Sequence, residues 1–241
     1  MRMTFLCVLS LWVFNAFSQT FCGVIEYSDS SVFLQSVKKK KFTLGTSKYI
    51  TNGEKLKSLV SKDWFGDDTL RIATSIVNQD GYFTIDSLSK TMTRMYEDKK
   101  SYMDELKRSD NKPTDLGKLI KTEQSEMVCG IECVKYVKKE ESTFAGNTTY
   151  SETELYVTKK YGTNFNFASG SCFLNGYGIM MKMVFRSYSD ARRKKLDIYN
   201  LSVVSRIKEM PVDEKEFELP KDWPVRDVNV TRYVKALGGS N

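Results

Sequence analysis

Cysteines and carboxylates are the residues of this chain whose types and spacing could do chemistry, because the sequence contains no histidine. Without imidazole, the serine–histidine–acid and cysteine–histidine routes to an activated nucleophile are absent, as are the usual zinc and copper ligands. A four-thiolate zinc site needs two closely spaced cysteine pairs, and only Cys129 and Cys133 are so spaced. No glycine-rich phosphate loop, hydrolase elbow or calcium loop occurs either. The sequence therefore predicts no metal site, no cofactor and no enzymatic activity.

A pair of carboxylates remains the one arrangement that could still support catalysis, since glycoside hydrolysis needs only two acids at the right separation. The chain has 30 acidic residues, so candidate pairs are many and none is singled out. Secreted glycosidases usually line their cleft with aromatic side chains, yet this chain has three tryptophans, one of them Trp12 in the N-terminal apolar run. A carboxylate-pair hydrolase is therefore the least favoured function.

The N-terminus has the three parts of a secretory signal peptide. Arg2 precedes an apolar run over residues 5–14, and the small residues Ala16 and Ser18 follow it. A membrane anchor needs about 20 apolar residues, roughly twice the length of this run. Lipid attachment at Cys22 is disfavoured because the bulky Phe21 precedes it. We expect residues 1–18 to be a signal peptide cleaved near Ser18-Gln19, releasing a soluble periplasmic or extracellular protein that does not span a membrane.

The mature chain is basic and has the length of one large domain or two small ones. Removing 18 of the 241 residues leaves 223, and losing Arg2 lowers the formal charge from +7 to +6. Residues 19–241 are predicted to form a single β-rich domain, since all-β folds often reach this size. The charge favours acidic surfaces such as anionic lipid or polysaccharide, and an exported chain is not expected to bind nucleic acid. Two basic runs, residues 38–41 and 192–195, are interpreted as solvated turns in preference to binding patches.

Four cysteines remain in the mature chain, and an oxidising compartment would permit two disulfides in any of three pairings. The candidates are Cys22, Cys129, Cys133 and Cys172. Cys129 and Cys133 on one extended strand would lie about 13 Å apart, beyond disulfide reach, unless Gly130 breaks the strand. The alternative is that all four are free, buried thiols.

The pattern from residue 21 onward is one of successive strands. Period-two alternation between turn signals predicts an antiparallel meander, with Asn52-Gly53, Asp80-Gly81, Cys129-Gly130 and a hairpin at 147–149 as the turns. Strands are expected at 21–27, 42–51, 54–60, 70–77, 82–86, 91–96, 119–127, 131–137, 154–161, 179–186 and 196–207, with an irregular tail beyond. A segment dense in charge near 97–115 reads as a solvated helix or loop connecting two halves of the sheet.

One predicted strand carries a candidate ligand face. Strict alternation places four apolar side chains together and turns Lys182 and Arg186 to the opposite side. The four are Ile179, Met181, Met183 and Phe185. Methionine adapts to irregular ligands, so this face could bind an apolar molecule. The alternative is that the four residues pack the core of the sheet.

Several segments together resemble a known family. They are the signal end Ser18-Gln19 and the stretches FCGVIEY, GEKLKSLV, YFTIDSLSKTMTRMYE, MVCGIECVKY and VDEKEFELPKDW. Their order is similar to that in exported bacterial proteins of unknown function, frequent in Bacteroidetes, whose fold is similar to the outer-membrane lipoprotein carrier. The family's stretch Gly-Tyr-x-Cys-Lys-Lys-Tyr corresponds to 130–136 here, with Ile131 at the aromatic position.

The resemblance implies a mainly β fold, in which a strongly curved antiparallel sheet forms a half-barrel with one or two short helices. Lipoprotein carriers of that shape hold acyl chains between the sheet and a lid, and the segment near 97–115 could be such a lid. The implied function is binding of a lipid or other amphiphile in the concave face of the sheet. The alternative is a structural or interaction protein of the cell envelope with a filled core. The resemblance supplies no catalytic residues.

Overall fold

The computed structural model describes residues 19–34, 40–62, 71–78, 81–96, 119–144, 147–162, 173–174 and 177–229. The expected signal peptide, Cys172, residues 38–39 of the basic run 38–41, Asp80 of the expected Asp80-Gly81 turn and the polar segment near 97–115 lie outside these residues. The strands are β1 (Gln19–Thr20), β2 (Gly23–Phe33), β3 (Lys40–Thr51), β4 (Leu56–Lys62), β5 (Arg71–Asn78), β6 (Gly81–Asp86), β7 (Thr91–Tyr96), β8 (Ile120–Val128), β9 (Ile131–Phe144), β10 (Asn147–Thr158), β11 (Tyr161–Gly162), β12 (Phe173–Leu174), β13 (Gly178–Tyr188), β14 (Leu196–Glu209) and β15 (Val225–Asn229).

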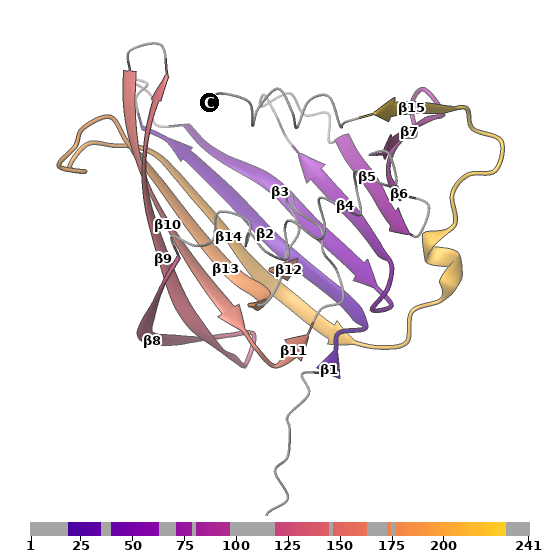
Figure 1. The fold of residues 1–241 in the computed structure, drawn as a ribbon, viewed down its shortest axis with the longest axis horizontal. Coiled ribbons are helices and arrows are strands. Elements are labelled where there is room, and N and C mark those ends of the chain that lie inside the picture. The colour runs from indigo at the N-terminus through magenta and orange to yellow at the C-terminus, as the bar shows by residue number, and fades with distance from the viewer. Residues whose placement is uncertain are drawn as a thin grey trace, which may run out of the picture.

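A single large sheet dominates the described residues. Its strand order is β15-β7-β6-β5-β4-β3-β2-β14-β13-β10-β9-β8, with β12 pairing beside β13, and every pairing is antiparallel except that of β15 with β7. The ribbon shows this sheet strongly curved and open, with β8 and β15 at its two ends (Figure 1). The expected fold class, a mainly β protein built on a curved antiparallel sheet, is confirmed.

The turn signals at Asn52-Gly53 and Cys129-Gly130 are confirmed, although the first of these loops is longer than expected. The turn expected at 147–149 is wrong, because these residues are the start of β10 and pair with residues 142–144 of β9. Cys129 and Gly130 connect β8 to β9 with φ values of 50° and 73°, the left-handed pair that a tight two-residue hairpin requires. At Asn52-Gly53 the last paired residues are Thr51 and Leu56, so the loop has four residues. The Asn52 side chain stabilises it by accepting from the backbone N–H groups of Glu54 and Lys55 at 3.0 and 2.7 Å.

The tail is more ordered than the sequence suggests. A short 3-10 helix, η2 (Glu214–Phe217), begins after Asp213, whose side chain accepts from the backbone N–H of Lys215. Phe217 is buried with Ile50 and Ile76, so η2 covers one side of β3 and β5. The chain then adds β15 in parallel to β7, which corrects the expectation of an irregular tail. Only five residues long, β15 has too little alternation to be recognised from sequence.

The main apolar core, here called the central cluster, draws on most of the sheet. It consists of Phe21, Ile25, Tyr27, Leu56, Val77, Val128, Cys133, Tyr156, Tyr161, Ile179, Met181 and Val204. Phe21 meets Tyr161 edge-on with ring centroids 5.0 Å apart, next to the short parallel pair of β1 and β11. The turn between β8 and β9 also reaches β14, because Cys129 Sγ donates to Val204 O at 3.1 Å. The core therefore connects strands that are far apart in the sequence, from β2 to β14.

Candidate ligand-binding face

Successive residues of β10 define the two faces of the sheet used below. Tyr156 belongs to the central cluster, whereas its neighbours Leu155 and Val157 belong to a separate apolar cluster. Because adjacent strand residues point to opposite sides, these clusters lie on opposite faces. We call the side of Tyr156 the first face and the side of Leu155 and Val157 the second face.

A β-bulge in β13 decides which of its residues reach each face. Tyr156 pairs with Lys182 and Val157 with Met180, which leaves Met181 without a partner on β10. An extra residue of this kind shifts the alternation of the strand by one position. A sequence pattern that assumes uninterrupted alternation therefore assigns the wrong side to residues beyond the bulge.

The four residues of the expected apolar face are divided by this bulge. Ile179 and Met181 are fully buried in the central cluster on the first face. Met183 packs on the second face, and Phe185 lies two residues further along the same side, partly buried. Lys182 and Arg186 do share a face, as predicted, but it is the face of Ile179 and Met181.

The second face of β9, β10 and β13 carries what we call the methionine cluster. Its floor is buried and consists of Tyr136, Leu155 and Val157. Around the floor lie side chains that keep part of their surface exposed, namely Leu119, Val134, Leu174, Tyr177, Met180 and Met183. Tyr136 and Tyr177 meet edge-on with centroids 5.3 Å apart, so β12 and the start of β13 fold against this floor. The arrangement offers a deformable apolar surface on one side of an open sheet.

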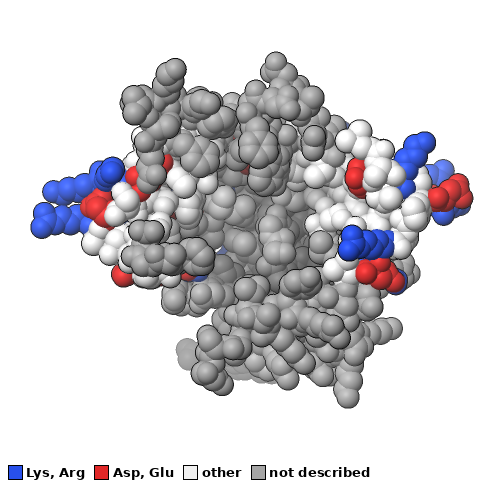
Figure 2. Space-filling view, turned by 90° about the horizontal axis from the view of Figure 1, so that it is seen from above, with Lys and Arg blue, Asp and Glu red and all other residues white. Residues whose placement is uncertain are grey.

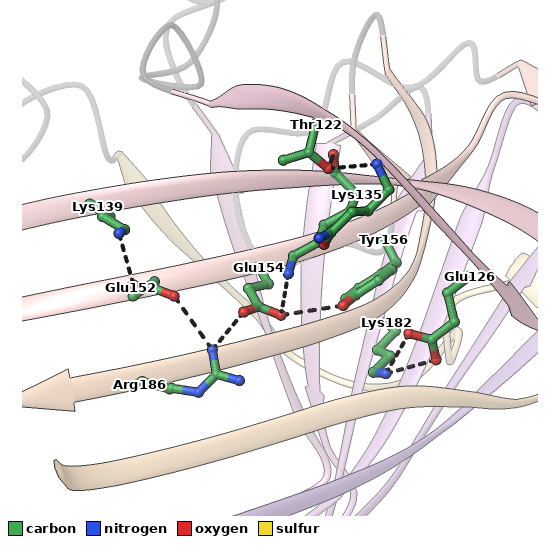
Figure 3. Close-up of polar contacts among 10 residues, drawn as sticks. Thr122, Glu126, Lys135, Lys139, Glu152, Glu154, Tyr156, Lys182 and Arg186 are labelled. Atoms are coloured by element: carbon green, nitrogen blue, oxygen red, sulfur yellow. Dashed lines mark hydrogen bonds and ion pairs between the residues drawn. The ribbon is translucent and has the colours of Figure 1, made fainter.

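The first face of the same strands carries a row of alternating charges, which we call the ionic row (Figure 3). Glu154 is at its centre: Arg186 Nη1 lies 2.8 Å from Oε1, and Lys135 Nζ lies 3.2 Å from Oε2. Arg186 also lies 3.7 Å from Glu152, which is 3.5 Å from Lys139. At the other end, next to the central cluster, Lys182 donates to both carboxylate oxygens of Glu126 at 2.8 and 2.9 Å.

The ionic row is partly buried, and this changes its electrostatics. The side chains of Glu154 and Lys135 are only 12% and 15% exposed. Burial alone would raise the pKa of Glu154, but the hydrogen bonds from Arg186 and Lys135 outweigh it and lower the pKa. The row holds four cations and three carboxylates, which makes it a nearly neutral, mutually satisfied network.

Aromatic rings reinforce this network. Lys182 Nζ lies 4.7 Å from the centroid of Tyr156 and Lys135 Nζ lies 5.8 Å from it. Arg186 similarly lies 5.9 Å from the ring of Tyr199 on β14. Each such contact contributes about 0.5–1 kcal/mol at sites of this kind. The cations of the row are therefore held by both carboxylates and rings, which fits a role in holding the strands together.

The three described cysteines are free thiols in the structure. Cys129 is exposed at the hairpin turn, Cys22 is partly buried and Cys133 is buried in the central cluster. Burial is the main cause that raises the pKa of Cys133 to about 11. Disulfide formation among Cys22, Cys129, Cys133 and Cys172 stays a prediction.

The two hairpin cysteines should differ sharply in reactivity. With reductant removed and the fold intact at pH 8, iodoacetamide is expected to alkylate Cys129 at least tenfold faster than Cys133, because the thiolate is the reactive form and Cys133 is buried. Peptide mapping by mass spectrometry measures both rates in one sample. Labelling in urea is the control, and equal rates in the folded chain would contradict the buried position of Cys133.

Comparison with known proteins gives likenesses in solved structures alone. No protein-family model and no curated protein matches the chain. It is similar to an uncharacterized conserved protein from Thermus thermophilus, with 11% identity, 86% of this chain and 91% of that chain covered, and a TM-score of 0.44. It is also similar to LprF from Mycobacterium bovis (9% identity, 80% and 89% covered, TM-score 0.33) and to an outer membrane lipoprotein-sorting protein domain from Vibrio parahaemolyticus (10% identity, 81% and 89% covered, TM-score 0.26).

The described residues also bear on two other kinds of site. Among them, no group of three or more cysteine, aspartate or glutamate side chains is arranged to hold a metal ion. No helix within the described ranges has the length and apolar character needed to cross a membrane.

Proposed function

We propose that this chain is exported after removal of residues 1–18 and binds a lipid or other amphiphile against the second face of its curved sheet. The methionine cluster is the observation that carries the proposal. Its buried floor is ringed by partly exposed apolar side chains, two of which are Met180 and Met183. Unbranched, polarisable methionine side chains adapt to flexible apolar ligands, and ligand pockets are lined mainly by apolar and aromatic groups.

The second face also changes polarity along its strands in the way that an amphiphile requires. Along β13, Met180, Met183 and Phe185 are followed by Ser187. On β10, the residues that pair with the last three are Leu155, Thr153 and Ser151. The apolar part of a ligand would lie over the methionine cluster, and its polar end would point along β13 toward residue 188. The ionic row on the opposite face would then fix the curvature of the strands.

A second function is favoured by the packing of the first face. Ile25, Ile179 and Met181 are completely buried in the central cluster. A well-packed core of this kind is what a structural or interaction protein of the cell envelope would need. In that case, the partly exposed side chains of the methionine cluster would contact a partner protein. No catalytic role is assigned to any residue.

Native mass spectrometry of the exported chain, purified in a volatile buffer without detergent, tests the ligand. A co-purified lipid or related amphiphile is expected on the wild type. The double variant Met180→Gln/Met183→Gln should lose at least tenfold in occupancy, because it makes the ligand surface polar at nearly constant volume. Met127→Gln/Met210→Gln is the matched control, since both methionines are exposed, at 62% and 38%, and belong to no apolar cluster of the described residues.

The outcomes separate the two functions. A folded wild type that carries no amphiphile, and acquires none from added lipid, contradicts the proposal. Equal occupancy in both double variants places the ligand elsewhere and contradicts the assigned face. A cross-linked envelope protein that is lost only in Met180→Gln/Met183→Gln, with no lipid in any sample, would favour the second function.

A further inference from the structure

The hairpin tip between β13 and β14 holds the densest group of positive charge in the described residues. Residues 189–195 read SDARRKK, and Arg192, Lys194 and Lys195 are exposed. None of these three cations takes part in an ion pair within the described part of the chain. Figure 1 shows this hairpin at one end of the molecule, and Figure 2 shows Lys and Arg side chains that extend from that end beyond the neighbouring Asp and Glu side chains. The sequence alone favours a solvated turn here, and the structure shows that hydrogen bonds within the turn hold its backbone in place.

The one acidic residue of the tip is occupied by the backbone. The Asp190 carboxylate accepts from the N–H groups of Lys194 at 3.3 Å and Lys195 at 2.6 Å. Asp190 O also accepts from the N–H of Arg193 at 2.9 Å. The carboxylate thus points inward and organises the turn, while the long cationic side chains of the neighbouring residues point outward.

Arg193 anchors the tip to the sheet. It adopts a left-handed φ of 53°, and its guanidinium lies 5.8 Å from the ring centroid of Tyr150 on β10. Arg193 is partly buried, in contrast to the residues on either side of it. Three exposed cations are therefore presented together on a turn that is fixed at its base.

We propose that this tip docks the protein onto an anionic lipid bilayer through Arg192, Lys194 and Lys195. A bilayer containing anionic lipid presents a continuous negative surface that several cations of one short tip can approach at once. The tip also lies at the end of β13 toward which the second face becomes polar, so docking would bring that end to the membrane surface. Docking through these three cations requires no bound ligand on the second face.

Vesicle co-sedimentation with the purified full-length mature chain tests the docking. Vesicles of phosphatidylcholine alone are compared with vesicles containing about one third phosphatidylglycerol. Each cation near such a surface strengthens binding about fivefold, so Arg192→Gln/Lys194→Gln/Lys195→Gln should weaken binding to the anionic vesicles about a hundredfold. Lys159→Gln/Lys208→Gln/Lys221→Gln is the matched control, because it removes the same charge from exposed lysines outside the tip.

Each outcome decides the proposal. Binding that requires phosphatidylglycerol, weakens in about 0.5 M salt and is lost only in the tip variant supports it. If both triple variants lose vesicle binding equally, net charge and not the hairpin tip causes the binding, and the proposal is overturned. Wild-type binding to a soluble anionic polysaccharide with none to the vesicles would also overturn it. Circular dichroism and thermal unfolding of both variants confirm that the fold is kept, and failure of amphiphile binding in the previous test leaves these results unaffected.

Discussion

Replacing Gly178 by alanine is expected to destabilise the protein by at least about 2 kcal/mol, a large effect for a single methyl group. Gly178 has a φ of 117°, which residues with a Cβ rarely adopt. A Cβ at this position would lie 2.1 Å from Thr158 O, a backbone atom that cannot move without breaking the pairing of β10 with β13. The damage falls close to the bulge at Met181 that separates Ile179 and Met181 from Met183 and Phe185.

Equilibrium unfolding in urea measures this effect, and Gly130→Ala is its control. Gly130 also has a positive φ, 73°, but a Cβ there would have no atom within 4 Å. The control should therefore show only the backbone cost of the left-handed conformation, about 1 kcal/mol. If the two variants have the same free energy of unfolding, close approach of β10 to residue 178 is not what selects glycine.

Replacing Glu154 by glutamine is expected to destabilise the protein by about 2 kcal/mol at neutral pH. The substitution keeps the size of the side chain but removes the charge shared by Lys135 and Arg186, whose side chains are 15% and 27% exposed. Two partly buried cations would then face each other without their common carboxylate. Asp227→Asn is the control, since Arg94 binds Asp227 through two hydrogen bonds of 2.8 Å but both side chains are more than one third exposed, and such pairs contribute at most about 1 kcal/mol.

The pH dependence gives this prediction a second readout. The pKa of Glu154 is lower in the folded protein than its ordinary value of 4.5, so its contribution is fully present above pH 4.5 and is lost as the pH falls through the folded value. The difference in free energy of unfolding between wild type and Glu154→Gln should therefore be largest at pH 7 and should shrink at about pH 3. A difference that stays constant over this range would mean that packing, and not charge, makes Glu154 important.

Much of the sheet could be predicted because its signals are local. Alternation and turn residues gave β7 at 91–96 without error and the turn at Cys129-Gly130, where two left-handed residues are needed. The sequence underestimates the lengths of β9 and β10, because the end of β9 (to Phe144) and the start of β10 (from Asn147) are polar and lack an alternation of apolar residues. The pairing of β15 with β7 joins residues more than 130 positions apart, and no local pattern in the sequence predicts it.

The candidate site is harder to predict than the sheet, because the position of one β-bulge decides which residues share a face. An unpaired Met181 reverses the sides of every later residue on β13, and nothing in the letters GIMMKMVF marks where a bulge will form. The pair Lys182 and Arg186 was recognised as sharing a face, but their partners Glu126 and Glu154 come from two other strands. Only the register of β8, β9, β10 and β13 brings these charges within contact distance.

The pairing of β2 with β14 has a consequence for how the chain is made. In the described sheet, the strands β2 to β7 follow one another, as do β8, β9, β10, β13 and β14 in reverse, and the hydrogen bonds that join these two halves are those between β2 and β14. A ribosome releases β2 long before it has made residues 196–209, so the first half must wait with one unpaired strand edge until almost the whole chain exists. Contacts of such high sequence separation also form slowly. Such a delay would suit the export proposed above, because a chain must be unfolded to pass through an export channel. A truncation before residue 196 removes β14 and should leave two unjoined runs of strands that aggregate.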